Sequence, residues 1–202
     1  MKLYDGQAPN PWRVRVFLAE KGVTVPMETM QVLDGSTRTE AFRKINSLGE
    51  LPVLELDDGR ILTESVAICR YLESEFPEPA LMGRDAFEKA HIEMWSRRME
   101  LQLVTALANV GLHTIPFFDG KIEQMPDYAD SQRRAAVKRW TWFDQEMSDG
   151  RAFVTGDQFT LADVTGMMAV KITDIVEEPM PANLKHAKAW EQRVRSRDSW
   201  SA

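Results

Sequence analysis

The spacing of apolar residues in the first eighty positions predicts strands and helices in mixed order. Val14, Phe17 and Leu18 have the spacing of one buried helix face. The pair Asn10-Pro11 is typical of a helix start, with Asn at the N-cap and Pro in the first turn. The predicted elements are a strand over residues 2–4, a helix over 11–21, a strand over 24–33 with a turn at 34–35, a short helix over 39–45, strands over 51–56 and 60–63, and a helix over 66–75 capped by Ser65. This βαβ, short helix, ββα order indicates a mixed sheet with helices packed on it.

The rest of the chain has helical periodicity. In a long helix predicted over residues 85–112, one apolar stripe has spacings of 3, 4, 4, 4 and 3, and a second set recurs every seven residues. The first stripe contains Ile92, Trp95, Met99, Leu103, Leu107 and Val110, and the second contains Phe87, Met94, Leu101 and Ala108. Two apolar faces predict burial on two sides, against a helical bundle and against either the first part of the chain or a second subunit.

Three further helices are predicted after this long helix. They span residues 127–147, 161–176 and 184–195. Thr160 and Asp163 have the spacing of a capping box at the start of the second one. Because a proline-rich break at 76–83 separates the two patterns, we expect an α/β domain over residues 1–77 and an all-helical bundle domain over 84–202.

Composition limits the chemistry that the chain can perform. The protein has 202 residues, a formal net charge of −6, one cysteine and three histidines. A single cysteine, Cys69, excludes an internal disulfide, and the histidines lack the spacing of a helical metal site. The acidic balance argues against nucleic acid as a partner. Because no apolar run approaches the ~18 residues of a membrane span and the start is not that of an export signal, we expect a cytoplasmic protein that uses neither a membrane nor a metal.

Five segments form an ordered set of motifs. They are the start Lys2-Leu3-Tyr4, the turn and helix at residues 8–22, the stretch 42–54 with Leu51-Pro52, the stretch 62–72 with Glu64-Ser65, and the capping segment at 159–163. Together they resemble the cytosolic glutathione transferase family over nearly the whole chain. Each motif alone is weak, but their order and spacing are specific for the fold. The resemblance implies a thioredoxin-like N-terminal domain, an all-helical C-terminal domain and pairing as a homodimer.

The resemblance also implies a glutathione site on the first domain. Leu51-Pro52 matches the family's cis-proline, where the backbone of Val53 or Leu51 pairs with the cysteinyl part of glutathione. Glu64 and Ser65 match the pair that holds the γ-glutamyl carboxylate. The helix that starts there favours an anion through its free N–H groups and its dipole.

Two positions concern the glycyl carboxylate of glutathione. Arg38, with Thr37 beside it, lies where family members place groups near that carboxylate, and an exposed loop arginine is the alternative. Glu50 stands where others carry Lys or Gln, so this position departs from the family pattern.

The position that activates the thiol also departs from the family pattern. Family members use a Tyr, Ser or Cys near the end of the first strand, and Ala8 occupies the place of the serine. Asn10 fits the spacing of an asparagine that some bacterial members use two places further on. Its side-chain amide would donate to the thiolate, with help from N–H groups of the helix start. The alternative is that Asn10 only caps the helix.

An open apolar site for a second substrate is implied between the two domains. The residues predicted to line it are Trp12, Ile115, Phe117 and Phe118. For Met167, a further candidate, core packing is the favoured interpretation. We interpret Cys69, inside a predicted helix, as a small buried hydrophobe rather than a nucleophile.

These residues leave three functions open. The first is a glutathione transferase, with glutathione as co-substrate, that adds the thiolate to a small apolar electrophile. The second keeps the glutathione site but reduces peroxides or disulfides or isomerises a substrate; the lack of a catalytic cysteine argues against a glutaredoxin-like mechanism. The third is a non-catalytic binding module on the same fold, against which Pro52, Glu64 and Ser65 argue.

Overall fold

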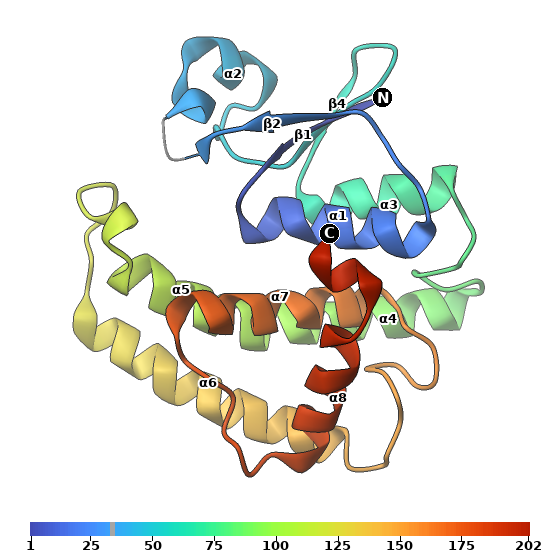
Figure 1. The fold of residues 1–202 in the computed structure, drawn as a ribbon, viewed down its shortest axis with the longest axis vertical. Helices are drawn as coiled ribbons and strands as arrows, with labels where there is room; N and C mark the ends of the chain where they lie inside the picture. Colours follow the sequence, from blue (N-terminus) through green and yellow to red (C-terminus); the bar gives the residue numbers. More distant parts are fainter. Residues whose placement is uncertain (33–34) are drawn as a thin grey trace. The chain divides into compact units, whose positions relative to one another are not determined.

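The computed structural model describes residues 1–32 and 35–202, which form two compact units (Figure 1). The first unit contains Met1–Leu81 and Asp198–Ala202, and the second contains Met82–Arg197. The first is α/β and the second is helical, as predicted. The division differs from the expected domain ranges at the C-terminus, because the last residues of the chain lie with the first unit.

The described sheet of the first unit has four strands in the order β2-β1-β3-β4. The strands are β1 (Lys2–Gly6), β2 (Met27–Met30), β3 (Val53–Glu55) and β4 (Ile61–Thr63). β1 and β2 are parallel, whereas β3 is antiparallel to both β1 and β4. This mixed sheet confirms the thioredoxin-like fold. β2 is shorter than the predicted strand, and Leu33 of that strand and Asp34 of the predicted turn lie outside the described residues.

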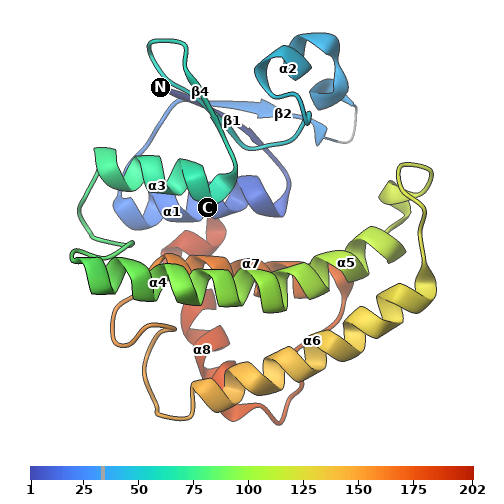
Figure 2. The same ribbon diagram turned by 180° about the vertical axis from the view of Figure 1, so that it is seen from behind.

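Helices lie on both faces of this sheet (Figures 1 and 2). They are α1 (Pro9–Lys21), the short η2 (Ser36–Arg38), α2 (Glu40–Ile45) and α3 (Ser65–Glu75). Tyr4 and Val53, which face each other across β1 and β3, pack against Phe42 of α2. Because side chains alternate along a strand, the fully buried Leu3 and Leu54 point to the opposite face, where α1 and α3 lie side by side.

Two helix starts lie earlier than predicted. α1 begins at Pro9 with Ala8 at the N-cap, so Asn10 is not the cap and is instead exposed in the first turn. Proline is favoured in a first turn because its fixed φ matches the helix, and Pro9 therefore lets the helix begin before Asn10. α3 begins at Ser65 itself, with Glu64 at the N-cap.

The C-terminal segment packs against α1. Trp200 of η5 (Asp198–Ser201) meets Trp12 edge to face, with 5.1 Å between the ring centroids. Ser199 donates a hydrogen bond to the carboxylate of Glu20, a residue 179 positions earlier. These contacts explain why the end of the chain belongs to the first unit.

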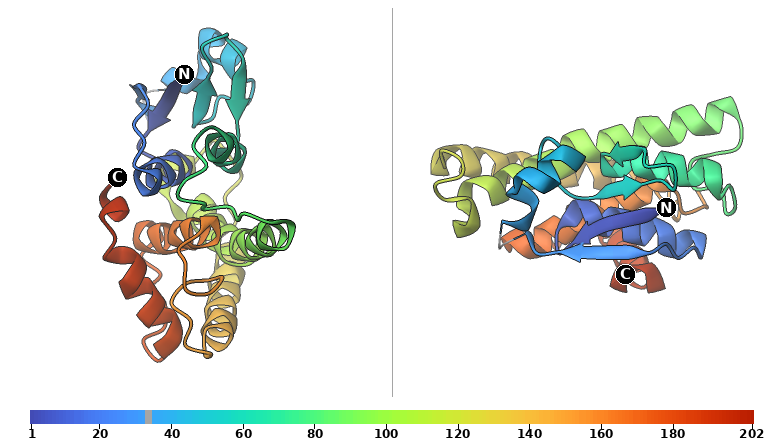
Figure 3. Two further views of the ribbon diagram at one scale, coloured as in Figure 1. Left: turned by 90° about the vertical axis from the view of Figure 1, so that its right-hand side faces the viewer. Right: turned by 90° about the horizontal axis from the view of Figure 1, so that it is seen from above.

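In the second unit, one helical rod extends from Ala86 to Thr114 (Figure 3). It consists of α4 (Ala86–Arg98), the π-helical η3 (Met99–Val104) and α5 (Thr105–Thr114). The predicted long helix is therefore confirmed, but its π-helical segment was not predicted. The first apolar stripe is buried throughout, whereas Phe87, Met94 and Leu101 of the second are exposed.

The helix α7 (Leu161–Val176) is the most buried helix of the second unit. Every residue from 161 to 170 is buried. The capping box predicted at Thr160 and Asp163 is present at its start. α4 approaches it through a buried hydrogen bond of 2.9 Å between the hydroxyls of Ser96 and Thr165.

Asp163 is a buried acceptor for several donors, and its loss is expected to destabilise the protein. Its carboxylate accepts the N–H groups of Val154 and Thr160 at 2.9 and 3.0 Å and the indole N–H of Trp190 at 2.9 Å. We expect Asp163→Ala to lower the free energy of unfolding by about 3 kcal/mol or more, because each unsatisfied buried donor costs about 1–3 kcal/mol. Urea unfolding measures this change. A loss below about 1 kcal/mol, similar to that of the exposed control Asp157→Ala, would contradict it.

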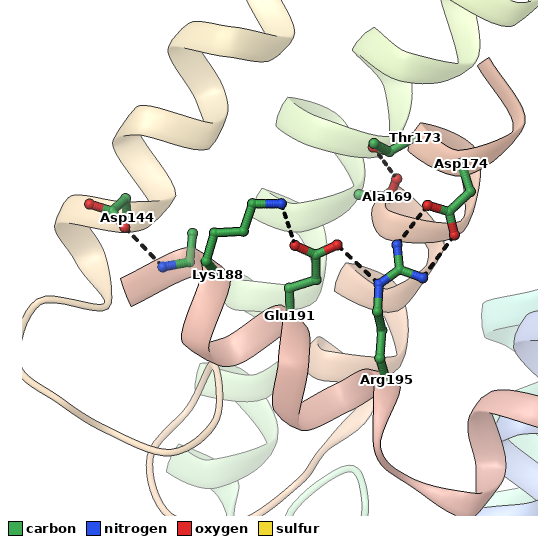
Figure 4. Close-up of polar contacts among 8 residues, drawn as sticks. Asp144, Ala169, Thr173, Asp174, Lys188, Glu191 and Arg195 are labelled. Carbon is green, nitrogen blue, oxygen red and sulfur yellow. Dashed lines mark hydrogen bonds and ion pairs between the residues drawn. The ribbon is translucent and has the colours of Figure 1, made fainter. Parts of the chain in front are cut away.

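The last helix, α8 (Lys185–Arg195), is tied to two neighbours (Figure 4). Its N-cap residue Leu184 offers no side-chain hydrogen bond. Asp144 of α6 (Pro126–Glu146) supplies the cap instead, accepting two N–H groups of the first turn at 2.7 and 2.9 Å. At the other end, Arg195 makes two hydrogen bonds of 2.9 and 2.6 Å to Asp174 of α7.

Candidate functional site

Three segments that are distant in sequence meet at one end of the sheet. Val53, the first residue of β3, pairs with Tyr4 of β1 on one side and with Thr63 of β4 on the other. Gly6, the last residue of β1, lies close to Leu51. A Cβ atom added to Gly6 would be only 2.8 Å from the side chain of Leu51. The end of β1, the Leu51-Pro52 bond and the start of α3 therefore surround one region of the first unit.

The Leu51-Pro52 peptide bond is cis, as the family resemblance implies. Leu51 precedes β3, so its backbone lies outside the described ladder, which begins at Val53. Asn46 braces the preceding loop: its side-chain amide donates to the carbonyl of Glu50 at 2.8 Å and its side-chain oxygen accepts from the N–H of Leu48 at 3.2 Å. The loop thus holds the backbone of Leu51 at the edge of the site.

Arg38 lies at the end of η2, next to this loop. Its side chain is exposed, and one guanidinium nitrogen donates to the carbonyl of Leu48 at 3.2 Å. Gly49, in the same loop, has a φ of 64°, and a Cβ atom there would lie 2.6 Å from the carbonyl oxygen of Thr37. Arg38 therefore helps to hold the loop, and its contact with a ligand stays a prediction.

The start of α3 combines an unusual backbone with a buried hydroxyl. Glu64 has a φ of 67°, which is rare for a residue with a side chain and is typical of functional sites. Ser65 follows as the first helical residue and is 6% exposed. The N–H groups of a first helical turn have no partners inside the helix, so this position favours an anion.

Arg13 joins the site although the sequence did not point to it. Its Nη1 atom donates to Oγ of Ser65 at 3.0 Å, and its side chain is 2% exposed. Sequence reasoning missed Arg13 because a charged residue in a helix usually faces solvent. A signal was present, since Arg13 lies four positions before the buried Phe17 and so shares its helix face.

The start of α1 offers few hydrogen-bond donors. Pro9 and Pro11 have no N–H group, and the N–H groups of Ala8 and Trp12 bond to the carbonyls of Gly6 and Ala8 at 2.9 and 3.1 Å. In the described structure, the N–H of Asn10 makes no hydrogen bond, and neither does its exposed side-chain amide. Asn10 thus carries two available donor groups, its backbone N–H and its side-chain amide, at this helix start.

The residues predicted for a second substrate fall into both units. In the first, Trp12 is 3% exposed and packs on Trp200, so most of its ring surface is already covered. In the second, Ile115 and the residues Phe117 and Phe118 of η4 (Pro116–Phe118) are partly exposed. The two phenylalanine rings meet edge to face at 5.1 Å.

Gln124 fixes the loop that carries this aromatic pair. Its side-chain amide donates to the carbonyls of Leu112 and Ile115 at 2.9 and 3.0 Å. The ammonium group of Lys121 lies 3.0 Å from the centroid of the Phe117 ring. The loop therefore presents a braced, partly exposed apolar surface on the second unit.

Cys69 is completely buried in α3. Burial raises the pKa of its thiol to about 12. The interpretation of Cys69 as a small buried hydrophobe is confirmed, because such a thiol carries almost no thiolate near neutral pH.

We therefore expect Cys69 to react with a thiol-specific disulfide reagent only when the protein unfolds. At pH 8 its thiol is both protonated and out of reach of solvent, because its pKa is about 12 and its exposure is 0%. Absorbance of the released thiol, followed in buffer and across a urea series, measures the reaction. Rapid, complete reaction in native buffer would show that Cys69 is accessible.

Two further features of the described residues concern membranes and metals. Among the described helices, none has the length and apolar character that crossing a membrane requires. Within residues 1–32 and 35–202, no group of three or more His, Cys, Asp or Glu side chains is arranged to hold a metal ion.

Two family models match the chain. The model of the glutathione S-transferase N-terminal domain matches residues 8–75, which contain the Leu51-Pro52 bond and the start of α3. The model of the glutathione S-transferase C-terminal domain matches residues 107–198.

Individual proteins are similar over most or part of the chain. Glutathione S-transferase 2 of Saccharomyces cerevisiae is 32% identical over 98% of this chain and 87% of its own length. The crystal structure of a glutathione S-transferase domain-containing protein from Marinobacter aquaeolei has a TM-score of 0.92 and 35% identity, over 98% of this chain and 99% of that one. A maleylacetoacetate isomerase of Pseudomonas aeruginosa is 36% identical over 45% of this chain and 44% of its own length.

Proposed function

Because this chain belongs to the glutathione S-transferase family, we propose that it binds glutathione through its first unit and activates the glutathione thiol. The reaction we propose is attack of the thiolate on a small apolar electrophile. The observation that carries the proposal is the meeting of the cis Leu51-Pro52 bond and the start of α3 at one end of the sheet. Glutathione is the co-substrate, and the proposed chemistry uses no metal.

The backbone of Leu51 is the proposed partner of the cysteinyl part of glutathione. Val53 has sheet partners on both sides, Tyr4 and Thr63, so its N–H and C=O groups point toward a neighbouring strand. Leu51 precedes the ladder, which leaves its backbone to pair with an extended peptide. The register of the sheet thus favours Leu51 over Val53 as the residue whose backbone pairs with glutathione.

Glu64 and Ser65 are proposed to hold the γ-glutamyl end of glutathione. The hydroxyl of Ser65 and the N–H groups of the first turn of α3 would donate to the α-carboxylate. Glu64 would act through its backbone or through the ligand ammonium group. Arg38 would lie near the glycyl carboxylate at the other end of the ligand.

Asn10 is the proposed donor to the thiolate. Lowering a thiol pKa from about 8.5 to about 6.5 requires about 2.7 kcal/mol. A hydrogen bond to a charged group supplies about 1.5–3 kcal/mol, and the helix dipole adds to it. The available N–H and side-chain amide of Asn10 are both suited to this role.

The second substrate is proposed to contact the apolar surface around Ile115, Phe117 and Phe118. Partly exposed aromatic rings on a braced loop suit a small apolar electrophile. Trp12, the candidate on the first unit, is 3% exposed and packs on Trp200, so its ring offers little surface to a ligand. A cytoplasmic location fits the use of glutathione, which is kept reduced there.

Isomerisation is the second candidate function. The partial similarity to a maleylacetoacetate isomerase favours it, because an isomerase of this kind would use the same glutathione site. Peroxide or disulfide reduction and a non-catalytic binding role are weaker alternatives.

A panel of reactions with glutathione distinguishes these functions. It consists of an aryl halide, an α,β-unsaturated carbonyl, an organic hydroperoxide, a mixed disulfide and a cis-dienone. The proposal predicts conjugation of the first two by the parent protein and a fall of that activity in Ser65→Ala when glutathione is subsaturating. Activity on the cis-dienone alone would favour the isomerase, and no activity on any substrate would favour a binding module.

The protein is also proposed to form a homodimer through α4 and η3. Phe87, Met94 and Leu101 recur every seven residues there and are 76%, 38% and 60% exposed. Large exposed apolar side chains in a row are typical of interaction surfaces. Sedimentation is expected to give twice the chain mass of 23.1 kDa, and Leu101→Glu is expected to give a single chain. A parent protein of one chain mass at micromolar concentration would contradict this.

A further inference from the structure

Arg13 places a buried positive charge behind the start of α3. Its Nη1 atom donates to Oγ of Ser65 at 3.0 Å, and the two residues are 2% and 6% exposed. They come from α1 and α3, which lie side by side in Figure 2. A guanidinium remains charged throughout the physiological pH range. A permanent cation therefore contacts the hydroxyl at the proposed carboxylate site.

We propose that Arg13 is a positioning residue that aims the hydroxyl of Ser65 at the γ-glutamyl carboxylate of glutathione. The inference rests on the proposed function and adds to the same site a residue that does not touch the ligand. Arg13 acts through Ser65 in two ways. It fixes the direction of the Ser65 hydroxyl proton, and it adds positive charge behind the hydroxyl.

The hydrogen-bond inventory of the serine supports this role. A hydroxyl has one proton and two lone pairs. The N–H of Arg13 Nη1 donates to one lone pair of Ser65 Oγ. Because this N–H repels the hydroxyl proton of Ser65, that proton points away from α1. In the described part of the chain, the Ser65 hydroxyl donates to no acceptor, so its proton remains for a ligand. A cationic donor also polarises the hydroxyl and strengthens the hydrogen bond that it gives.

The positive charge of Arg13 also acts on the thiol of Cys69. Cys69 lies one turn after Ser65 in α3. Burial raises the pKa of its thiol, and the positive charge of Arg13 opposes that rise. The hydrogen bond of Arg13 to Ser65 places the guanidinium at the first turn of α3, where its positive charge adds to the helix dipole.

The test compares two ligands that differ only in the α-carboxylate. The first is glutathione, and the second is its analogue with a 4-aminobutyryl group in place of the γ-glutamyl group. Calorimetric titration gives both dissociation constants, and their ratio measures how strongly the site recognises the carboxylate. For the parent protein we expect a ratio of about tenfold or more, as for a charge-assisted hydrogen bond.

Variants of Arg13 separate its positioning role from its packing role. In Arg13→Gln, which removes the charge, we expect the ratio to fall to about threefold or less. In Arg13→Lys, which keeps a cation that can donate to Ser65, we expect the ratio to stay within about threefold of the parent value. Lys21→Met is the matched control, because Lys21 and Glu73 form a buried ion pair of 2.5 Å between the same two helices. It is expected to reduce stability but to keep the full ratio.

Two results would overturn the inference in different ways. An Arg13→Gln protein that binds both ligands with the parent ratio would show that Arg13 only packs between α1 and α3. An equal fall of the ratio in Lys21→Met would also show that Arg13 only packs. Any change that weakens the packing of α1 on α3 would then be enough to lower the ratio. Failure of the parent protein to bind glutathione would instead overturn the proposed function, and the inference with it.

Discussion

Replacing Ser65 by alanine is expected to weaken glutathione binding about ten- to hundredfold. The variant loses a hydroxyl that would donate to a carboxylate at a helix start, and a hydrogen bond to a charged group contributes about 1.5–3 kcal/mol. The same change removes one acceptor of Arg13, so some loss of stability accompanies it. The affinity is expected to change more than the stability, because the remaining contacts of α3 stay in place.

Calorimetric titration, with thermal unfolding in parallel, measures both effects of Ser65→Ala. Ser74→Ala is the matched control: Ser74 lies on the same helix, is exposed, and donates only to the carbonyl of Arg70 at 3.2 Å. It is expected to bind glutathione as the parent does. Unchanged affinity in Ser65→Ala would remove Ser65 from the site.

Replacing Asn10 by alanine is expected to raise the pKa of the bound glutathione thiol by about 1–2 units. The side-chain amide stabilises the thiolate rather than the thiol, and each pKa unit corresponds to about 1.4 kcal/mol. Turnover near neutral pH therefore falls, and the pH–rate profile moves to higher pH. Because Ala8 and not Asn10 is the N-cap, Asn10→Ala is expected to leave the stability of α1 nearly unchanged.

Thiolate absorbance in the ultraviolet, titrated with glutathione saturating, measures the pKa in each variant. Asn10→Asp is expected to raise it further than Asn10→Ala, since it places a negative charge beside the thiolate. If Asn10→Ala leaves the pKa unchanged, the side chain has no part in activation. The backbone N–H of residue 10, which alanine retains, would then be the donor, and Asn10→Pro would remove it.

Local features of the fold could be predicted from the sequence. The capping box at Thr160 and Asp163 lies within four residues and forms as predicted. The cis bond at Leu51-Pro52 was expected because the residues around it resemble the family's cis-proline motif. Such features depend on neighbours in the chain, and their spacing is visible in the sequence.

Features that depend on distant partners could not be predicted. Arg13 is buried because it reaches Ser65, 52 positions later, and Trp12 is covered by Trp200 from the other end of the chain. The start of α1 was misplaced because Asn10-Pro11 is a good start signal, yet Pro9 is equally suited to the first turn. For the candidate site, the sequence pointed to the segments that we propose face the ligand, but not to the charge behind them.

The central claim is that the first unit binds glutathione and promotes ionisation of its thiol. Calorimetric titration of the parent protein near pH 7, repeated in two buffers of different ionisation enthalpy, measures binding and proton release together. The account predicts that one glutathione binds per chain and that a proton is released on binding. It predicts that S-methylglutathione, which has no thiol, binds without release of a proton. Absence of binding at millimolar glutathione, or binding with no proton released, would contradict it.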